Sequence, residues 1–293
     1  MSRPVRTEGE SRNGPHKGRP LSAPGHPPSQ IRPAPLETTV ASPQGCLLLV
    51  PNTLDHGNDP VGIDQVLAQG VLKHAAAVRH WVVEDARSAR SFLKRVDAVV
   101  PLGVPLQALS MVELPRPRKG SREAVGPDDW LALLQPAIEG HDLGLLSEAG
   151  LPAVADPGAA LVDAAHAHGI PVRALPGASA MLLALAASGL NGQSFAFVGY
   201  LPQEADSRLR RLRELEALSR QAQQTQLFIE TPYRNPALTA AILTGLQPST
   251  RLSISCGLTL PDGWTRCQSI AQWRQSPPQV SDRMPAVFAI LAR

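Results

Sequence analysis

Short apolar runs alternate with helix-like segments along most of this chain, and this alternation limits the folds open to it more than any other feature. Each run is only a few residues long, and the segments between the runs have helical periodicity or a high alanine content. Near-continuous apolar strands joined by helices are typical of a parallel sheet that helices cover on both faces. We therefore predict an α/β fold. The expected strands of this first region are CLLLVP (46–51), HWVVED (80–85), DLGLLS (142–147) and PVRAL (171–175).

The segments between these strands carry the start and stop signals of helices. The segment 127–140 has Asp128 and Asp129 in its first turn and a glycine at its end, and 86–96 is basic and amphipathic. Acids in the first turn and glycine after the last turn are favoured at helix termini. The expected helices cover 63–78, 86–96, 127–140, 157–169 and 177–189.

The pattern changes after Gly192, where a second set of strands and helices begins. A long, highly charged helix is expected over 205–221 and an alanine-rich helix over 235–246. We predict two α/β domains, residues 46–190 and 191–293. The expected strands of the second domain are 193–202, 225–234, 250–258 and 284–292.

Residues 1–45 differ from the rest in composition. They are crowded with Pro, Gly, Ser and Arg and have no helical or strand periodicity, so we predict a disordered tail. The tail holds six Lys or Arg and three acids, and the whole chain has a formal net charge of +3. The remainder is therefore balanced in charge, and the basic pI does not by itself indicate nucleic-acid binding by the folded part.

Composition excludes several classes of protein. No apolar run approaches the roughly 18–20 residues that span a membrane. Cys46, Cys256 and Cys267 are odd in number and lack the CxxC spacing, which argues against a disulfide framework and favours a reducing cytoplasm. No Walker GxxxxGK[ST] sequence occurs, and no GxGxxG follows the first strand, so ATP and NAD(P) binding are disfavoured. No metal site is predicted.

Two loops at the ends of expected strands are unusual. SEAGLPAVADPG (147–158) places two acids among glycines and prolines, and LPGAS (175–179) follows the next strand. Ligands of open parallel sheets bind at the carboxyl ends of strands, where such loops gather. Gly150 and Pro152 would make the loop rigid and let its backbone approach a ligand closely. Asp156 before Pro157 has the pattern of a helix N-cap followed by a first-turn proline. An acid here suits a ribose or a cationic ligand.

These motifs resemble the tetrapyrrole methylase superfamily of S-adenosyl-L-methionine (SAM)-dependent methyltransferases. Within it, the resemblance is closest to the ribosomal RNA small-subunit methyltransferase I group. It covers residues 46–293 and is strong over 144–234. The matching segments, in family order, are VVEDARSARSFLKR, SEAGLPAVADPG, LPGASAMLLALAASGL, FAFVGYLP, IETPYR and CGLT.

The resemblance implies two α/β domains with SAM in the cleft between them, in a homodimer. Asn52 and Pro51 match the family's first-strand loop, near the methyl acceptor. Together with Asp156 from the loop argument, the predicted cofactor-binding residues are Pro51, Ser147, Glu148, Ala149, Gly150, Asp156, Pro176, Gly177, Ser179, Tyr200, Glu230, Thr231, Pro232, Leu258 and Thr259.

The chain also departs from the family pattern. Its first loop reads VPNTLDHGNDP, where the family has Thr-Pro-Ile-Gly-Asn-Leu, so the acceptor side is altered. The chain stops at AVFAILAR, where the RNA methyltransferases continue with a helical extension.

Methyl transfer from a sulfonium depends chiefly on proximity and orientation, and a hydroxyl acceptor would profit from a general base. The predicted catalytic residues are Glu84 and Asp85 as bases and Arg87 as a clamp for phosphate or carboxylate. The alternative is a salt-bridge cluster at the strand end. Glu230 beside Arg234 is equally open to interpretation as an interdomain ion pair or a ligand contact.

Three functions follow from these observations. The first, which we predict, is SAM-dependent methylation of RNA, with a ribose 2′-hydroxyl of 16S rRNA in the small ribosomal subunit as acceptor. The second is methylation of a small molecule of the tetrapyrrole type. The third is a SAM-binding module without catalysis, which the altered first loop favours.

Overall fold

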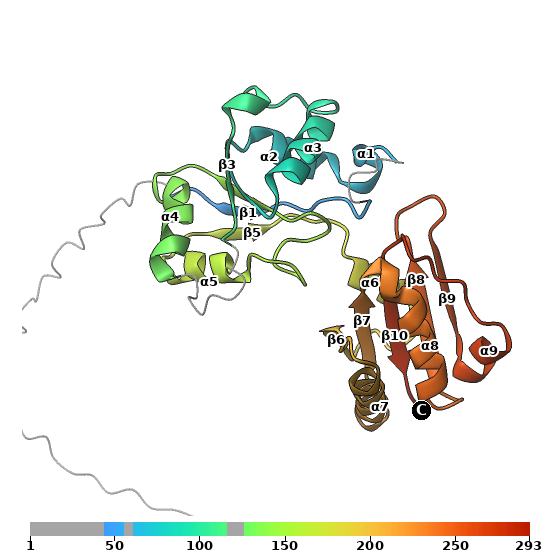
Figure 1. The fold of residues 1–293 in the computed structure, drawn as a ribbon. Helices are drawn as coiled ribbons and strands as arrows, with labels where there is room; N and C mark the ends of the chain where they lie inside the picture. Colours follow the sequence, from blue (N-terminus) through green and yellow to red (C-terminus); the bar gives the residue numbers. More distant parts are fainter. Residues whose placement is uncertain (1–43, 56–60, 116–125) are drawn as a thin grey trace, which may run out of the picture. The chain divides into compact units, whose positions relative to one another are not determined.

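The structure is a computed structural model that describes residues 44–55, 61–115 and 126–293. The predicted disordered tail lies almost entirely outside these residues. Two five-stranded sheets, each covered by helices, organise the described residues (Figure 1).

The first sheet is entirely parallel, with strand order β3-β2-β4-β1-β5. The parallel prediction is therefore confirmed. The central strand β4 pairs with both β1 and β2, so the loops that follow these three strands emerge side by side at one edge of the sheet. The strands are β1 (Leu47–Leu49), β2 (His80–Val83), β3 (Ser110–Glu113), β4 (Leu143–Leu146) and β5 (Val172–Ala174).

Both faces of the three central strands β1, β2 and β4 are buried, because successive residues of each strand point to opposite cores. Leu48 and Trp81 belong to the core beneath α2 and α3, whereas Leu47 and Val82 belong to the core beneath α4 and α5. Gly144 on β4 accommodates the Trp81 ring, since a Cβ at this position would lie 2.6 Å from a ring carbon. The helices are α1 (Ile63–Val66), α2 (Gln69–Ala77), α3 (Ala86–Asp97), α4 (Pro127–Ile138) and α5 (Ala159–Ala167), with the short 3₁₀ helix η1 (Leu106–Ala108) before β3.

Two features of this region differ from the prediction. The single helix expected over 63–78 is broken at Leu67 and Ala68, which have extended backbone angles. Ile63, Leu67 and Val71 all remain buried in one core, so the break preserves the apolar contacts. Strand β3 was missed because it lies at the edge of the sheet, and its largely exposed residues form no buried apolar run.

The second sheet is mixed, with strand order β6-β7-β10-β8-β9. Strands β6 and β7 are parallel, and the remaining neighbours are antiparallel. The strands are β6 (Phe195–Tyr200), β7 (Thr225–Glu230), β8 (Arg251–Cys256), β9 (Trp264–Ser269) and β10 (Ala286–Leu291); the other elements are α6 (Ala180–Ser188), α7 (Ala205–Ala222), η2 (Pro232–Arg234), α8 (Asn235–Gly245) and α9 (Ile270–Gln275).

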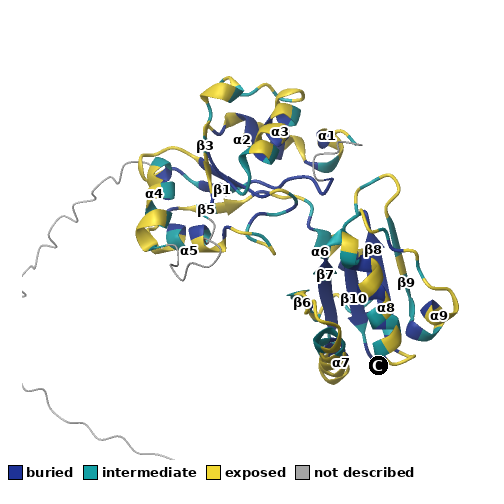
Figure 2. Cartoon of the chain, in the orientation of Figure 1, coloured by how far each residue is buried: buried dark blue, intermediate teal, exposed yellow. Residues whose placement is uncertain are grey.

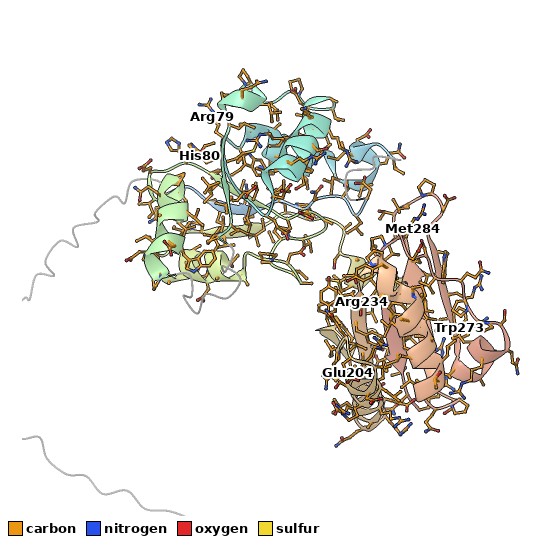
Figure 3. All side chains as sticks on the ribbon, in the orientation of Figure 1. Arg79, His80, Glu204, Arg234, Trp273 and Met284 are labelled. Carbon is orange, nitrogen blue, oxygen red and sulfur yellow. The ribbon has the colours of Figure 1, made fainter. Side chains whose placement is uncertain are left out.

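The second sheet also has two cores, which Figure 2 shows as dark blue strands under partly exposed helices. Phe228 and Phe288 pack with α7, α8 and α9, and Trp273 of α9 is fully buried among them (Figure 3). Ala184 and Leu185 of α6 pack on the opposite face, against Leu227 and Val287. Strand β9 and helix α9 were not predicted, because β9 is polar and only partly buried.

Helix α6 precedes the predicted domain boundary at residue 190, yet its buried residues belong to the core of the second sheet. The division into domains at that residue stays a prediction. None of the helices in the described ranges is long and apolar enough to cross a membrane.

Candidate functional site

The loops after β1 and β4 are bonded to each other where they leave their strands. The backbone N–H of Asn52 donates to Gly150 O (2.8 Å), and the N–H of Gly150 donates to Thr53 O (3.3 Å). The buried Asn52 side chain donates from Nδ2 to the carbonyls of Ser147 and Glu148, both at 3.0 Å. These bonds fix the two loops as one unit at the carboxyl edge of the first sheet.

The loop between β4 and α5 has strained backbone. Ala153 and Ala155 both have a φ of 65°, in the left-handed region that residues with a Cβ seldom adopt. Such strain of about 1–3 kcal/mol per residue is most often found at functional sites. The predicted N-cap at Asp156 is wrong: α5 begins at Ala159 with Gly158 as N-cap, at a φ of 123° that leaves Pro157 in the preceding turn.

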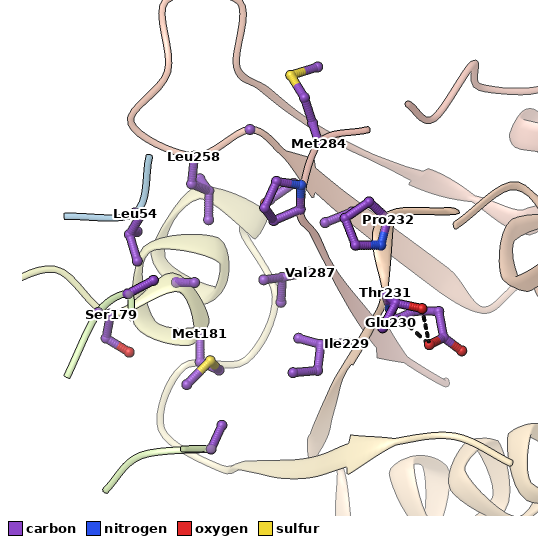
Figure 4. A pocket seen from close by; sticks show the side chains of 18 of the residues that line it. Leu54, Ser179, Met181, Ile229, Glu230, Thr231, Pro232, Leu258, Met284 and Val287 are labelled. Atoms are coloured by element: carbon purple, nitrogen blue, oxygen red, sulfur yellow. Dashed lines mark hydrogen bonds between the residues drawn. The ribbon is translucent and has the colours of Figure 1, made fainter. Parts of the chain in front are cut away.

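A cavity of about 520 Å³ lies against these loops (Figure 4). Met181, Ile229 and Val287 form an apolar wall, and acids and backbone groups complete the lining. A cavity of this size and mixture is typical of a small-molecule or cofactor site. The lining residues are Leu54, Asp55, Ala149, Gly150, Leu151, Val154, Ala155, Asp156, Ser179, Ala180, Met181, Tyr200, Ile229, Glu230, Thr231, Pro232, Ser255, Gly257, Leu258, Leu260, Arg283, Met284, Pro285, Ala286 and Val287.

Glu230 is the most deeply buried acid of the cavity wall, with a fully buried side chain. Its Oε1 accepts from Arg234 (Nη2 at 2.7 Å) and from the backbone N–H of Thr231 (2.8 Å). The ion pair of Glu230 and Arg234 therefore exists, but it is local to β7 and η2 and does not join two domains. The other oxygen, Oε2, is buried and has no hydrogen-bond partner among the described residues, so it is a polar group that a ligand can satisfy.

The surroundings of Asp156 alter the ionisation of its carboxyl. Burial, together with the nearby charges of Glu84 and Glu148, raises the pKa of Asp156 from 3.8 to about 6. Desolvation also raises the pKa of Tyr200, with Asp156 and Glu230 adding to the effect. Acids that face one another in a partly desolvated site favour a cationic ligand.

This pKa has a consequence for stability. Because the carboxyl of Asp156 binds its proton more tightly in the folded chain than in the unfolded chain, the free energy of unfolding falls as pH rises from about 4 through 6. Asp156→Asn removes this dependence, and we expect the variant to be more stable than wild type at pH 7 and nearly equal at pH 4. Urea unfolding of both proteins across this range tests it, and parallel curves would contradict it.

A second, polar hollow of about 280 Å³ lies beside the loops, and it contains two of the predicted catalytic residues, Asp85 and Arg87. Asp85 is the N-cap of α3, and its Oδ1 accepts from the N–H of Ser88 (2.7 Å). Glu84 lines neither space, and its Oε2 accepts from the N–H of Glu148 (3.1 Å). The lining residues are Asn52, Asp85, Arg87, Ser88, Ser91, Phe92, Arg95 and Glu148.

The structure brings most of the predicted cofactor-binding residues to the cavity wall. Pro51 and Gly177 are not in the wall, but they pack together so closely that a Cβ at Gly177 would overlap the Pro51 ring. Ser147 is buried beneath the loops, and its Oγ has no partner among the described residues. Those in the wall are Ala149, Gly150, Asp156, Ser179, Tyr200, Glu230, Thr231, Pro232 and Leu258; those outside it are Pro51, Ser147, Glu148, Pro176, Gly177 and Thr259.

Sequence reasoning missed part of the cavity wall, including Asp55 and the segment 283–287. Asp55 lines the cavity and forms a bidentate ion pair with Arg95, with Nη2–Oδ2 at 2.8 Å and Nη1–Oδ1 at 3.1 Å. The segment 283–287 also lines the cavity. Neither the acid of the altered first loop nor this strand start carries a recognisable motif. No group of three or more His, Cys, Asp or Glu that could hold a metal ion occurs among the described residues.

Comparison with known proteins links this site to one family. The model of the tetrapyrrole (corrin/porphyrin) methylases matches residues 68–263, which include most of the cavity wall. The solved structure of the methyltransferase CobJ covers 86% of this chain and 100% of its own, with a TM-score of 0.50 and 19% sequence identity. At 19% identity, this similarity shows a shared fold and nothing about activity.

Two relatives share more of the sequence. The ribosomal RNA small subunit methyltransferase I of Halalkalibacterium halodurans is 35% identical over 151 residues, 52% of this chain and 45% of the relative. The protein of the same name from Streptococcus pyogenes is 34% identical over 190 residues, 65% of this chain and 57% of the relative. The matched part thus spans about half the length of these curated relatives.

Proposed function

Because this chain belongs to the tetrapyrrole (corrin/porphyrin) methylase family, we propose that it is a SAM-dependent methyltransferase. The observation that carries the proposal is the cavity, whose wall contains most of the residues at which the chain resembles the family's cofactor-binding segments. The described residues fit the cofactor chemically. SAM has two cationic groups, its sulfonium and its ammonium, and a flat aromatic adenine whose faces pack on apolar surface.

The cavity offers a counterpart to each part of this cofactor. Asp156 supplies negative charge for a cationic group, and the unpartnered Glu230 Oε2 is an acceptor for an N–H or O–H donor. Ile229 and Val287 supply apolar surface for a ring. The proposed binding residues are those of the predicted set that line the wall, with Pro51 and Gly177 supporting the loops behind them.

The chemistry demands little of the protein. When bound, SAM supplies a methyl group already activated as a sulfonium, so the rate depends chiefly on orientation. The protein's task is to exclude water, position the acceptor and accept a proton. We assign proton transfer from a hydroxyl acceptor to Glu84 or Asp85, with Arg87 as an anion clamp. All three lie next to the loop that carries Ala149 and Gly150 of the wall.

The proposed acceptor is RNA, a ribose 2′-hydroxyl of 16S rRNA in the small ribosomal subunit. The names of the relatives support this choice. A cytoplasmic location follows from a ribosomal substrate. A homodimer is proposed with it, because α6 exposes Leu182 (53%) and Leu183 (38%), apolar side chains that a second copy would cover.

A matched pair of variants tests the cofactor site. Val154 lines the cavity and Val99, two residues after α3, does not, although both are 44% exposed. We expect Val154→Trp to weaken SAM binding at least tenfold, because the indole fills part of the cavity, and Val99→Trp to leave the affinity unchanged. Calorimetry with SAM measures both. Equal SAM affinities of the two variants would show that the cavity is not the cofactor site.

Tritiated SAM identifies the acceptor. The purified protein is incubated with a lysate from cells that lack its gene, and the products are separated by size. Label in the small ribosomal subunit is the expected result. Label in the low-mass fraction would replace RNA with a small-molecule acceptor, and SAM binding without any labelled fraction would indicate a non-catalytic SAM-binding module.

A further inference from the structure

The polar hollow beside the cavity is lined largely by one face of α3. Arg87, Ser88, Ser91 and Arg95 follow the spacing that places residues on one side of a helix. Their side chains place two guanidinium groups and the Ser91 hydroxyl, which are hydrogen-bond donors, at this space, whereas the Ser88 hydroxyl donates to the Asp85 carbonyl (3.0 Å). Several hydrogen-bond donors therefore line one space of about 280 Å³.

The base of this hollow is rigid. The Arg95 side chain is only 11% exposed, and its guanidinium is held by both oxygens of Asp55 and by the hydroxyl of Thr53 (3.1 Å). A buried, bidentate guanidinium keeps one orientation. Arg87 differs, because its side chain is exposed and has no hydrogen bond or ion pair within the part of the chain that the structure describes. The Arg87 side chain can therefore reorient to contact a ligand, whereas the Arg95 guanidinium keeps a fixed position.

The hollow and the cavity share their walls. Asp55 lines the cavity while its partner Arg95 lines the hollow, and Glu148 of the hollow is followed directly by Ala149 of the cavity. A ligand anchored in the hollow thus lies one loop away from the cavity. An extended acceptor chain needs this arrangement, because one of its units binds in the hollow while the neighbouring unit lies next to the cofactor.

We propose that this hollow binds a backbone phosphodiester of the RNA acceptor, with Arg87 and Ser91 as its contacts and Arg95 as its fixed base. The proposal rests on the proposed function and adds the place where RNA is held. Guanidinium and hydroxyl donors are among the groups that contact phosphate oxygens. Helix α3 carries four basic side chains and one acid, and the hollow itself is lined by two arginines and two acids.

Two acids in the hollow are compatible with this ligand. The carboxylate of Asp85 accepts from the N–H of Ser88, which directs one oxygen toward the backbone of its own helix. Glu148 is exposed, and its backbone N–H and C=O are bonded to Glu84 and Asn52. Neither acid pairs with Arg87, so a phosphate does not have to displace an existing partner of that guanidinium.

Arg87→Ala and Arg90→Ala provide the test, because Arg90 lies on the same helix but outside the hollow, with Nη1 bonded to Ala86 O. Binding of purified small ribosomal subunits is measured at several salt concentrations. One lost phosphate contact should lower the slope of log K against log salt by about 0.7–0.9. We expect this change and a several-fold weaker binding in Arg87→Ala. Arg87→Lys should restore the slope, and Arg90→Ala should retain it.

The outcomes separate this inference from the proposed function. Calorimetry with SAM is run on each variant, and the affinity should match wild type because Arg87 does not line the cavity. If SAM binds and the slope of Arg87→Ala equals that of wild type or of Arg90→Ala, the phosphate site is overturned and the proposed cofactor function stands. Failure of the wild-type chain to bind SAM would instead overturn the proposed function.

Discussion

Asp55→Ala is expected to lower the free energy of unfolding by about 3–5 kcal/mol, the cost of breaking a buried ion pair by removing one partner. The side chains of Asp55 and Arg95 are only 5% and 11% exposed. The substitution removes both carboxylate oxygens that the guanidinium contacts, and also the acceptor of the Thr53 hydroxyl (2.7 Å). The free-energy cost of burying the Arg95 guanidinium is then no longer offset by the Asp55 carboxylate.

Urea unfolding measures this loss, and Glu214→Ala is the control. Glu214 forms an ion pair with Arg211 at 3.1 Å on α7, but the two side chains are 60% and 39% exposed. An exposed pair of this kind contributes about 0–1 kcal/mol, so Glu214→Ala should change stability little. Equal losses in the two variants would mean that burial does not govern the energy of the Asp55 pair.

A double variant separates charge burial from lost packing. Replacing Arg95 with Met in the Asp55→Ala background removes the charge while keeping an unbranched side chain, and buried pairs are often replaceable by apolar residues at little cost. We expect the double variant to regain part of the stability that Asp55→Ala loses. A double variant less stable than the single one would show that Arg95 stabilises the fold mainly through other contacts.

The sequence predicts the parts of the site in which a motif directly follows an apolar strand. The run DLGLLS ends β4, so the apolar pattern alone places the loop with Gly150 and Asp156 at the carboxyl edge of a parallel sheet. The same reasoning places Ser179 after β5. Both loops reach the cavity wall, because parallel pairing brings these strand ends to one edge.

The parts that the sequence did not reveal depend on pairing between distant segments. β10 pairs antiparallel with β7, with Ala286 opposite Glu230, and this register brings Met284 and Pro285 to the cavity. An apolar run contains no information about the direction of its partner. The ion pair of Asp55 and Arg95 likewise joins residues 40 positions apart, and the basic face of α3 alone does not indicate which acid it meets.

Asn52→Asp is expected to be the second large loss, about 3 kcal/mol in the free energy of unfolding. Asn52 is 5% exposed, and its Nδ2 donates to the carbonyls of Ser147 and Glu148 while its Oδ1 accepts from the N–H of Thr53. An aspartate has nearly the same shape but replaces the donor with an oxygen that faces two carbonyl oxygens. Leaving two buried acceptors unsatisfied costs about 1–3 kcal/mol for each.

Asn191→Asp is the matched control, because Asn191 has the same pattern of bonds in a more accessible turn. Its Nδ2 donates to Gln223 O (2.7 Å), and its Oδ1 accepts from the N–H groups of Gln193 and Ser194. Water can replace the lost donor there, so we expect a change below about 1 kcal/mol. Urea unfolding compares the two variants, and similar losses would contradict a specific role for burial at Asn52.

The Asn52 variant also affects the proposed cofactor site. The bonds from Asn52 hold the loop that carries Ala149 and Gly150 of the cavity wall. When that loop is no longer fixed, SAM binding must also order it, and the affinity falls by the cost of that ordering. Calorimetry at a temperature where both proteins are folded should therefore give weaker SAM binding for Asn52→Asp and unchanged binding for Asn191→Asp. A folded Asn52→Asp protein with wild-type affinity would mean that the cavity does not depend on this junction of the two loops.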